Sequence, residues 1–352
     1  MQTRFSILLV AAALLVGGCD HRSPLALQVS SPTARIKSPA IANARSGSAA
    51  IWSGGAQHVE GTTGPGALYA IDVPANWNGD LVVYAHGYIE ESGAAVALPN
   101  IGYFRDPLLA RGFAMAVSSF SENGYALKEG ALQTHQLSGL FATRFGQPRR
   151  TFITGQSLGG IIALKLAETY PQQYAGAMMG CGVVGGTRDQ ITYIANVRVL
   201  FDYFYPNVLP GSLLETPPGI DFATQVVPHI VQAITANPNG AFFMTRILPI
   251  PFASSQELVE AIVRALGFQF LGATDFLDRS HGHVFFENSR TVYTGAGVPQ
   301  AVLDDLNAKV ARYQATPDAA NFLAQCYQPN RTAEHPGGHA PHDARSDRAA
   351  LQ

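Results

Sequence analysis

The stretch that decides the fold is Arg150-Thr151-Phe152-Ile153-Thr154-Gly155-Gln156-Ser157-Leu158-Gly159. Its first five residues predict a short buried strand, and the apolar pattern that starts at Leu158 predicts a helix ending at Tyr170-Pro171. Gly-x-Ser-x-Gly at such a junction is typical of a nucleophile elbow, a turn so tight that small residues must flank the serine. We therefore expect Ser157 to be a nucleophile, although a Gly-rich turn with an incidental serine would share this pattern.

Segments on both sides of the elbow predict a mostly parallel, doubly wound α/β sheet. Residues 81–85 and 113–117 are continuous apolar runs, as expected of strands buried on both faces. Strands that alternate with helices favour a parallel sheet. The other predicted elements are strands at 67–73 and 174–180 and helices at 106–111 and 127–145.

The motif and its surroundings resemble the α/β-hydrolase-fold serine hydrolases of the secreted esterase and peptidase-like branch. The resemblance is carried by Ala85-His86-Gly87-Tyr88, by the elbow, and by Met179-Gly180-Cys181-Gly182-Val183, and it spans about Gly64 to Pro329. It implies that the backbone N–H groups of Tyr88 and Leu158 hold the oxyanion formed during acyl transfer.

The resemblance also implies the class of substrate and the role of one histidine. The substrate would be a carboxylic ester, or an amide or peptide, and neither a metal nor an organic cofactor is implied. His86 precedes the nucleophile, which is the wrong chain order for the base of this fold. We expect His86 to orient its loop.

The first residues predict an export signal. Arg4 is followed by an apolar run from Phe5 to Val16, which is shorter than the roughly 20 residues needed to cross a bilayer. Val16-Gly17-Gly18-Cys19 resembles a bacterial lipobox, so residues 1–18 would be removed and Cys19 lipidated. A plain secretory signal is the alternative. Asp20 would indicate inner-membrane retention under the enterobacterial sorting rule. The protein would then be anchored in the bacterial cell envelope, on the extracytoplasmic face.

Composition sets limits on the rest of the chain. Residues 19–53 are rich in Ser, Pro, Ala and Arg, which predicts a flexible tether, and residues 54–184 would form the hydrolase core. The net charge of −2 argues against nucleic-acid binding, and a hydrophobic content of 47% fits a globular enzyme. If Cys19 is lipidated, Cys181 and Cys326 are left to pair, or Cys181 is an inert buried thiol.

Residues 185–325 predict a mostly helical lid inserted after the core. Helices are expected at 190–203, 222–236 and 256–266, the last of them capped by Ser254 with Glu257 three residues later. Aromatic side chains of this region would either line an apolar substrate pocket or form the core of the lid itself. They are Phe201, Tyr203, Phe204, Tyr205, Phe242, Phe243, Phe268 and Phe270.

The acid and the histidine that should follow Ser157 cannot be named from the sequence. Candidates inside the insertion or at helix starts are Asp275, Asp278, His281, His283, Asp304, Asp305 and Asp318. Asp343 comes late enough but has no histidine after it, and no run after Pro329 resembles a buried strand. The last sheet strands are therefore predicted to be missing, and turnover to be feeble or absent, because a serine without its base loses most of its catalytic power.

Three interpretations of residues 326–352 compete. A reading frame shifted near Asn330 would restore a strand that the resemblance leads us to expect at this point. Alternatively, the chain is a non-catalytic envelope lipoprotein that binds a ligand or partner in the lid cleft. A third interpretation makes His335, His339, His342 and Asp343 a base or a metal site, but the intervening prolines and glycines favour a solvated tail.

Overall fold

The computed structural model describes residues 54–64, 66–91 and 95–319. The predicted signal peptide, tether and tail, with Cys19, Cys326 and the histidines after residue 330, lie outside the described residues.

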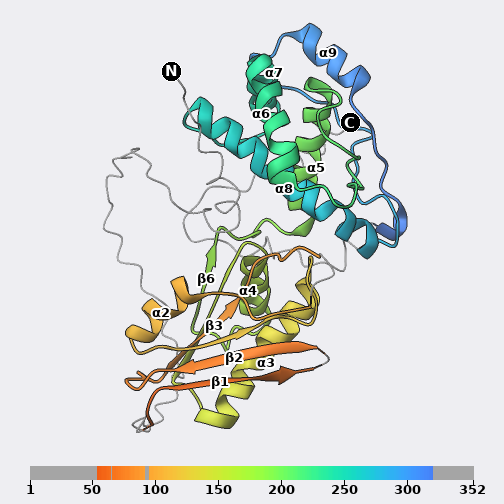
Figure 1. Cartoon of the computed structure of the whole chain (residues 1–352). Coiled ribbons are helices and arrows are strands. Elements are labelled where there is room, and N and C mark those ends of the chain that lie inside the picture. Colours follow the sequence, from red (N-terminus) through yellow and green to blue (C-terminus); the bar gives the residue numbers. More distant parts are fainter. Residues whose placement is uncertain (1–53, 65, 92–94, 320–352) are drawn as a thin grey trace.

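A six-stranded sheet in the order β1-β2-β4-β3-β5-β6 is the centre of the fold (Figure 1). β3, β4, β5 and β6 pair in parallel, whereas β1 and β2 pair with each other, and β2 with β4, in antiparallel fashion. Among the described residues β6 pairs with β5 alone. The strands are β1 (Gln57–Thr63), β2 (Ala67–Val73), β3 (Asp80–Ala85), β4 (Ala114–Ser118), β5 (Arg150–Gln156) and β6 (Gly176–Gly180). The predicted mostly parallel α/β sheet is confirmed.

Helices cover both faces of this sheet. Leu81 and Val83 point to the face on which α3 (Leu127–Phe145) packs, beside α4 (Leu158–Thr169). Val82 and Tyr84 point to the opposite face and meet α2 (Gly102–Ala110). Because successive side chains of a strand alternate between faces, a strand buried on both faces is expected to be apolar along its length, as β3 is from Leu81 to Ala85.

The remaining helices form a separate layer, here called the cap, which extends from residue 187 to 319. Figure 1 shows it beyond one end of the sheet. Its core is built from its own apolar residues, among them Phe201, Met244, Ile262 and Phe286, each almost fully buried. The elements are α5 (Thr187–Phe204), η2 (Phe222–Val226), α6 (Val227–Ala236), α7 (Pro238–Ile247), α8 (Ser255–Arg279) and α9 (Gln300–Lys309).

The longest helix of the cap, α8, has the predicted N-cap residue, Ser254, but is longer than predicted. Ser254 accepts a hydrogen bond from the Glu257 amide at 3.2 Å, which satisfies a donor that the helix leaves free. The predicted end at residue 266 was wrong, because α8 continues to Arg279. Gly267 lies inside the helix, where a Cβ would come within 3.0 Å of the Phe222 ring, so it permits close packing rather than ending the helix.

The cap aromatics support the interpretation that they form the core of the lid. Phe201, Tyr205 and Phe270 are at most 5% exposed and belong to the core of the cap. Phe242 and Phe268 are 40% and 43% exposed. The buried rings stabilise the cap by removing apolar surface from water.

Candidate active site

Ser157 stands in the elbow between β5 and α4. Its φ of 54° and ψ of −119° are unusual for a residue with a side chain, and such a conformation persists only where the surroundings enforce it. Here the Ser157 amide donates to the Gly180 carbonyl at 3.1 Å, and the Ser157 carbonyl accepts from the amides of Gly160 and Val183. The turn is thereby tied to the segment that follows the neighbouring strand β6.

The two glycines of the motif are required by space. A Cβ on Gly155 would lie 2.0 Å from the carbonyl oxygen of Gly159, and one on Gly159 would lie 2.0 Å from that of Ala85. These contacts are with backbone atoms, which cannot rotate away as a side chain can. The motif therefore needs glycine at both positions because α4 lies so close to the ends of β3 and β5.

The loop after β3 lies directly against Ser157. A Cβ built on Gly87 would be 3.5 Å from the Ser157 Cβ and 3.3 Å from the Gln156 carbonyl oxygen. Tyr88 follows in this loop, and Leu158, only 1% exposed, is the first residue of α4. The first amides of a helix have no partner within the helix and carry partial positive charge, which suits them to bind an anion.

His86 is buried beneath the same loop. It is 5% exposed, its ring stacks on Phe120 with centroids 3.7 Å apart, and its Nδ1 donates to the Gly87 carbonyl at 2.7 Å. Burial lowers the pKa of His86, against the opposite effect of the Gly87 and Ser119 carbonyl groups. A neutral ring that bonds its own loop fits the orienting role expected from the sequence.

A model of an esterase family matches the part of the chain that contains the elbow. The model described as "Putative esterase" matches residues 110–203, which include the elbow and its helix. The chain has an α/β-hydrolase fold, and residues 110–203 are similar to this esterase family. No curated protein matches the chain.

Solved structures resemble this chain only distantly. An esterase from Aspergillus oryzae is 18% identical with a TM-score of 0.30, covering 46% of this chain and 33% of that one. A thermostable carboxyl esterase from Bacillus coagulans is 13% identical with a TM-score of 0.32, covering 61% and 74%. The chain thus spans about a third of the length of the Aspergillus oryzae enzyme. The fold is identified by the sheet order and the elbow, and the similarity to esterases is that of residues 110–203 to the family model.

The structure does not bring a histidine or a carboxylate to the Ser157 hydroxyl within the described ranges. Asp275 accepts hydrogen bonds from Arg279 Nε at 2.6 Å and from the Tyr125 amide at 2.7 Å, so both of its oxygens are engaged. Four of the other candidates are bound elsewhere: Asp304 to Gln300, Asp305 to Lys309 and Tyr203, and His283 to Asp318 at 3.3 Å. Asp343 lies outside the described residues.

Cys181, next to the elbow, is not a buried thiol. It follows β6 with a φ of 47°, its side chain lies at the surface, and it is disulfide-bonded. The possibility of an inert buried thiol was therefore wrong. The reason is that β6 lies at the edge of the described sheet, where an apolar sequence need not be buried. The two other cysteines, Cys19 and Cys326, lie outside the described residues.

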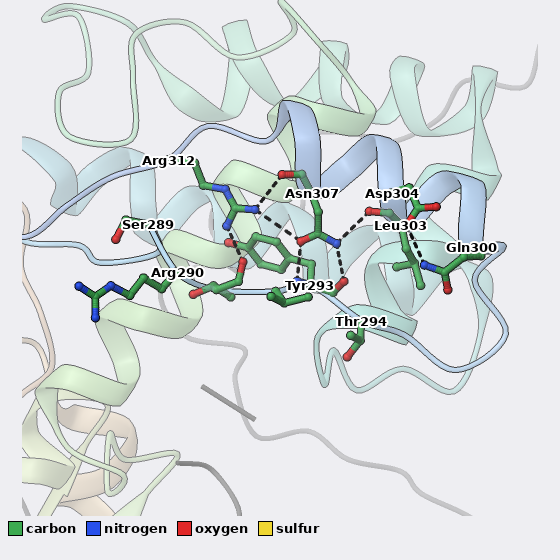
Figure 2. A pocket seen from close by; sticks show the side chains of 11 residues that line it. Ser289, Arg290, Tyr293, Thr294, Gln300, Leu303, Asp304, Asn307 and Arg312 are labelled. Atoms are coloured by element: carbon green, nitrogen blue, oxygen red, sulfur yellow. Dashed lines mark hydrogen bonds between the residues drawn. The ribbon is translucent and has the colours of Figure 1, made fainter. Parts of the chain in front are cut away.

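A pocket of about 420 Å³ in the cap does not belong to this site (Figure 2). Arg312 lines it and donates to the carbonyl groups of Asn288, Thr291 and Asn307, which fixes the irregular chain beside α9. A second pocket of about 330 Å³ lies along residues 207–210 and 220–229. Ser157 lines neither pocket, so neither shows where a substrate would bind.

In the described part of the chain, no helix is both long and apolar enough to span a membrane. In the same residues, no three His, Cys, Asp or Glu side chains gather as metal ligands would.

Proposed function

We propose that this chain is a serine hydrolase that cleaves carboxylic esters, with amides or peptides as further substrates. The single observation that carries the proposal is the strained elbow at Ser157, with the loop of Gly87 packed against it. The family model adds support for ester hydrolysis in general.

In the proposed reaction the Ser157 oxygen attacks the acyl carbon while the Tyr88 and Leu158 amides hold the oxyanion. The C–O bond of the ester then breaks, the alcohol leaves with a proton, and an acyl-serine remains. Water hydrolyses this acyl-serine to the free carboxylic acid and restores the serine. Each fixed oxyanion donor is worth roughly 10²–10³-fold in rate in such enzymes.

The decisive experiment is labelling of the purified full-length protein with a fluorophosphonate probe. We expect the wild type to be labelled at Ser157 and Ser157→Ala to remain unlabelled. Ser255→Ala, which alters an exposed serine on α8, is the control and should be labelled like the wild type. A well-folded wild type that takes up no label would contradict the proposal and favour a non-catalytic binding protein.

We further propose that Cys19 carries a lipid that anchors the enzyme on the extracytoplasmic side of the bacterial envelope. The support is the apolar segment from Phe5 to Val16 followed by Val16-Gly17-Gly18-Cys19. Metabolic incorporation of a palmitate analogue into the wild type, but not into Cys19→Ala, would be the expected result. Incorporation into both proteins would contradict the anchor.

A further inference from the structure

Both ends of the cap's main helical pair converge on one short loop of the core, Glu122–Tyr125, here called the 122–125 loop. Near the start of the cap, Thr187 begins α5, is fully buried, and its hydroxyl lies 2.9 Å from the Tyr125 hydroxyl. At the other end, Phe276 of α8 packs on the Tyr125 ring with centroids 4.8 Å apart. The 122–125 loop is therefore the place where cap and core are joined.

The strongest contacts at this joint are charged. Arg279 donates from Nη1 to the Glu122 carboxylate at 2.8 Å and from Nη2 to the Asn123 carbonyl at 3.0 Å. Its Nε bonds Asp275, and Asp275, 3% exposed, accepts the Tyr125 amide. Charge-assisted hydrogen bonds in a buried setting are stronger than neutral ones and fix geometry.

The same loop holds the 86–89 segment beside Ser157. The Gly124 amide donates to the Ile89 carbonyl at 2.7 Å, and the two residues form an isolated antiparallel bridge. Gly124 has a φ of 79°, and a Cβ there would lie 2.6 Å from an Asp275 oxygen. The Asp275–Arg279 pair thus packs against the Gly124 backbone, whose amide holds Ile89 of the 86–89 segment.

Tyr88 supplies a second connection from this segment to the same helix. Its hydroxyl donates to the Leu271 carbonyl of α8 at 3.2 Å. Burial, together with the negative charge of Asp275, raises the pKa of Tyr88, so the hydroxyl keeps the proton that it donates. Burial and then the hydrogen bond with Asp275 also raise the pKa of Glu91, three residues further along.

We propose that the Asp275–Arg279 pair of α8 is a positioning device that sets the Tyr88 amide at the distance from Ser157 needed for oxyanion binding. The pair acts through the 122–125 loop and does not touch the reacting atoms. The inference rests on the proposed function and makes the cap a structural part of the site. Displacing an oxyanion donor by about 1 Å costs on the order of 10²-fold in rate.

The test measures the second-order rate constant for fluorophosphonate labelling of Ser157 in full-length variants. We expect Asp275→Asn and Arg279→Gln to lower it roughly 10- to 100-fold, and Arg279→Lys to recover part of the loss. Tyr88→Phe keeps the backbone and the ring, and should give a smaller loss. With an ester substrate the loss should appear in kcat rather than in KM, because the oxyanion exists only after attack.

Asp202→Asn is the matched control. Arg198 and Asp202 form the same i,i+4 pair at 2.8 Å inside the cap, and Arg198 is 1% exposed. Among the described residues, the hydrogen bonds of this pair stay within the cap. This variant should weaken the cap without slowing labelling. A rate that falls as far in Asp202→Asn as in Asp275→Asn would overturn the inference, and so would an unchanged rate in folded Asp275→Asn.

Amide hydrogen exchange separates this inference from the proposed function. Faster exchange in residues 86–91 of Asp275→Asn, but not of Asp202→Asn, is expected whether or not the enzyme turns over. Unchanged exchange there would overturn the positioning role even if the wild type is labelled. A wild type that is not labelled at Ser157 would overturn the proposed function itself, and the assigned role with it.

Discussion

Gly159 is one of two residues at which the elbow leaves no room for a side chain, the other being Gly155. An added Cβ on Gly159 would lie 2.0 Å from the Ala85 carbonyl oxygen and 2.7 Å from that of His86. We expect Gly159→Ala to lower the free energy of unfolding by at least about 3 kcal/mol, because strand and helix must move apart. Urea denaturation followed by far-ultraviolet circular dichroism would measure it.

Gly139 offers the matched substitution in a place with room. It lies in α3, exposed, and an added Cβ would have no neighbour within 4 Å. Gly139→Ala should raise the free energy of unfolding by about 0.5–1 kcal/mol through helix propensity. Equal effects of the two substitutions would show that the elbow is not as closely packed as described.

His86 should give the protein a pH-dependent stability. Its ordinary pKa of 6.5 is lowered by burial, so its contribution is present above about pH 6.5 and is lost as pH falls through the folded-state pKa. The melting temperature of the wild type should exceed that of His86→Phe near pH 8, because the bond to Gly87 is lost, and the gap should narrow towards about pH 5. Burial also lowers the pKa of His135, but His135 is present in both proteins and so does not change the difference between their melting temperatures. A gap that stays constant with pH would contradict this assignment.

At the scale of elements, the buried parts of the fold could be predicted and the edges could not. β2 and α3 have the predicted bounds, since β2 is apolar except at Asp72 and α3 carries apolar residues at helical spacing. β1 was missed because Gln57–Thr63 holds a single large apolar residue, Val59, and its place is set by pairing with β2. Pairing between distant segments leaves no periodic pattern in an edge strand.

The N-cap residue of α8, Ser254, provides a prediction for a single element. Ser254 bonds the Glu257 amide, and the Glu257 carboxylate accepts from the Ala253 amide at 2.7 Å. Ser254→Ala should therefore lower the free energy of unfolding by about 1 kcal/mol. Ser255→Ala, one residue further into the helix, should change it by less than about 0.5 kcal/mol. Comparing the free energies of unfolding of both variants by chemical denaturation distinguishes loss of the Ser254 N-cap hydrogen bond from a general effect of removing a serine.

At the scale of the whole molecule, the site draws on segments that the sequence does not connect. The glycines around Ser157 marked the elbow from sequence alone, because their requirement is local. The joint between α8 and the 122–125 loop left no such signal, since Asp275 and Tyr125 are 150 positions apart. A buried ion pair looks the same in sequence as a solvated one, so the sequence marks Asp275 only as one of several candidate acids inside the insertion.

The disulfide of Cys181 leads to the last prediction, which concerns the whole chain. Cys181 is disulfide-bonded, and the chain has only two other cysteines, Cys19 and Cys326. A lipidated Cys19 would carry a thioether and could not pair, so under the proposed lipid anchor we expect a Cys181–Cys326 bond in the mature chain. Peptide mapping without reduction should find these two residues cross-linked, and Cys326→Ala should leave Cys181 free to react with iodoacetamide.

This bond would tie the chain beyond the cap to the residue that follows β6, close to the elbow. Losing a native disulfide typically costs about 2–5 kcal/mol, so Cys326→Ala should also melt at a lower temperature than the wild type. Cys19→Ala should keep the cross-link and the melting temperature, and it serves as the control. A Cys181–Cys19 cross-link would contradict both this pairing and the lipid anchor, because a single thiol cannot serve in both.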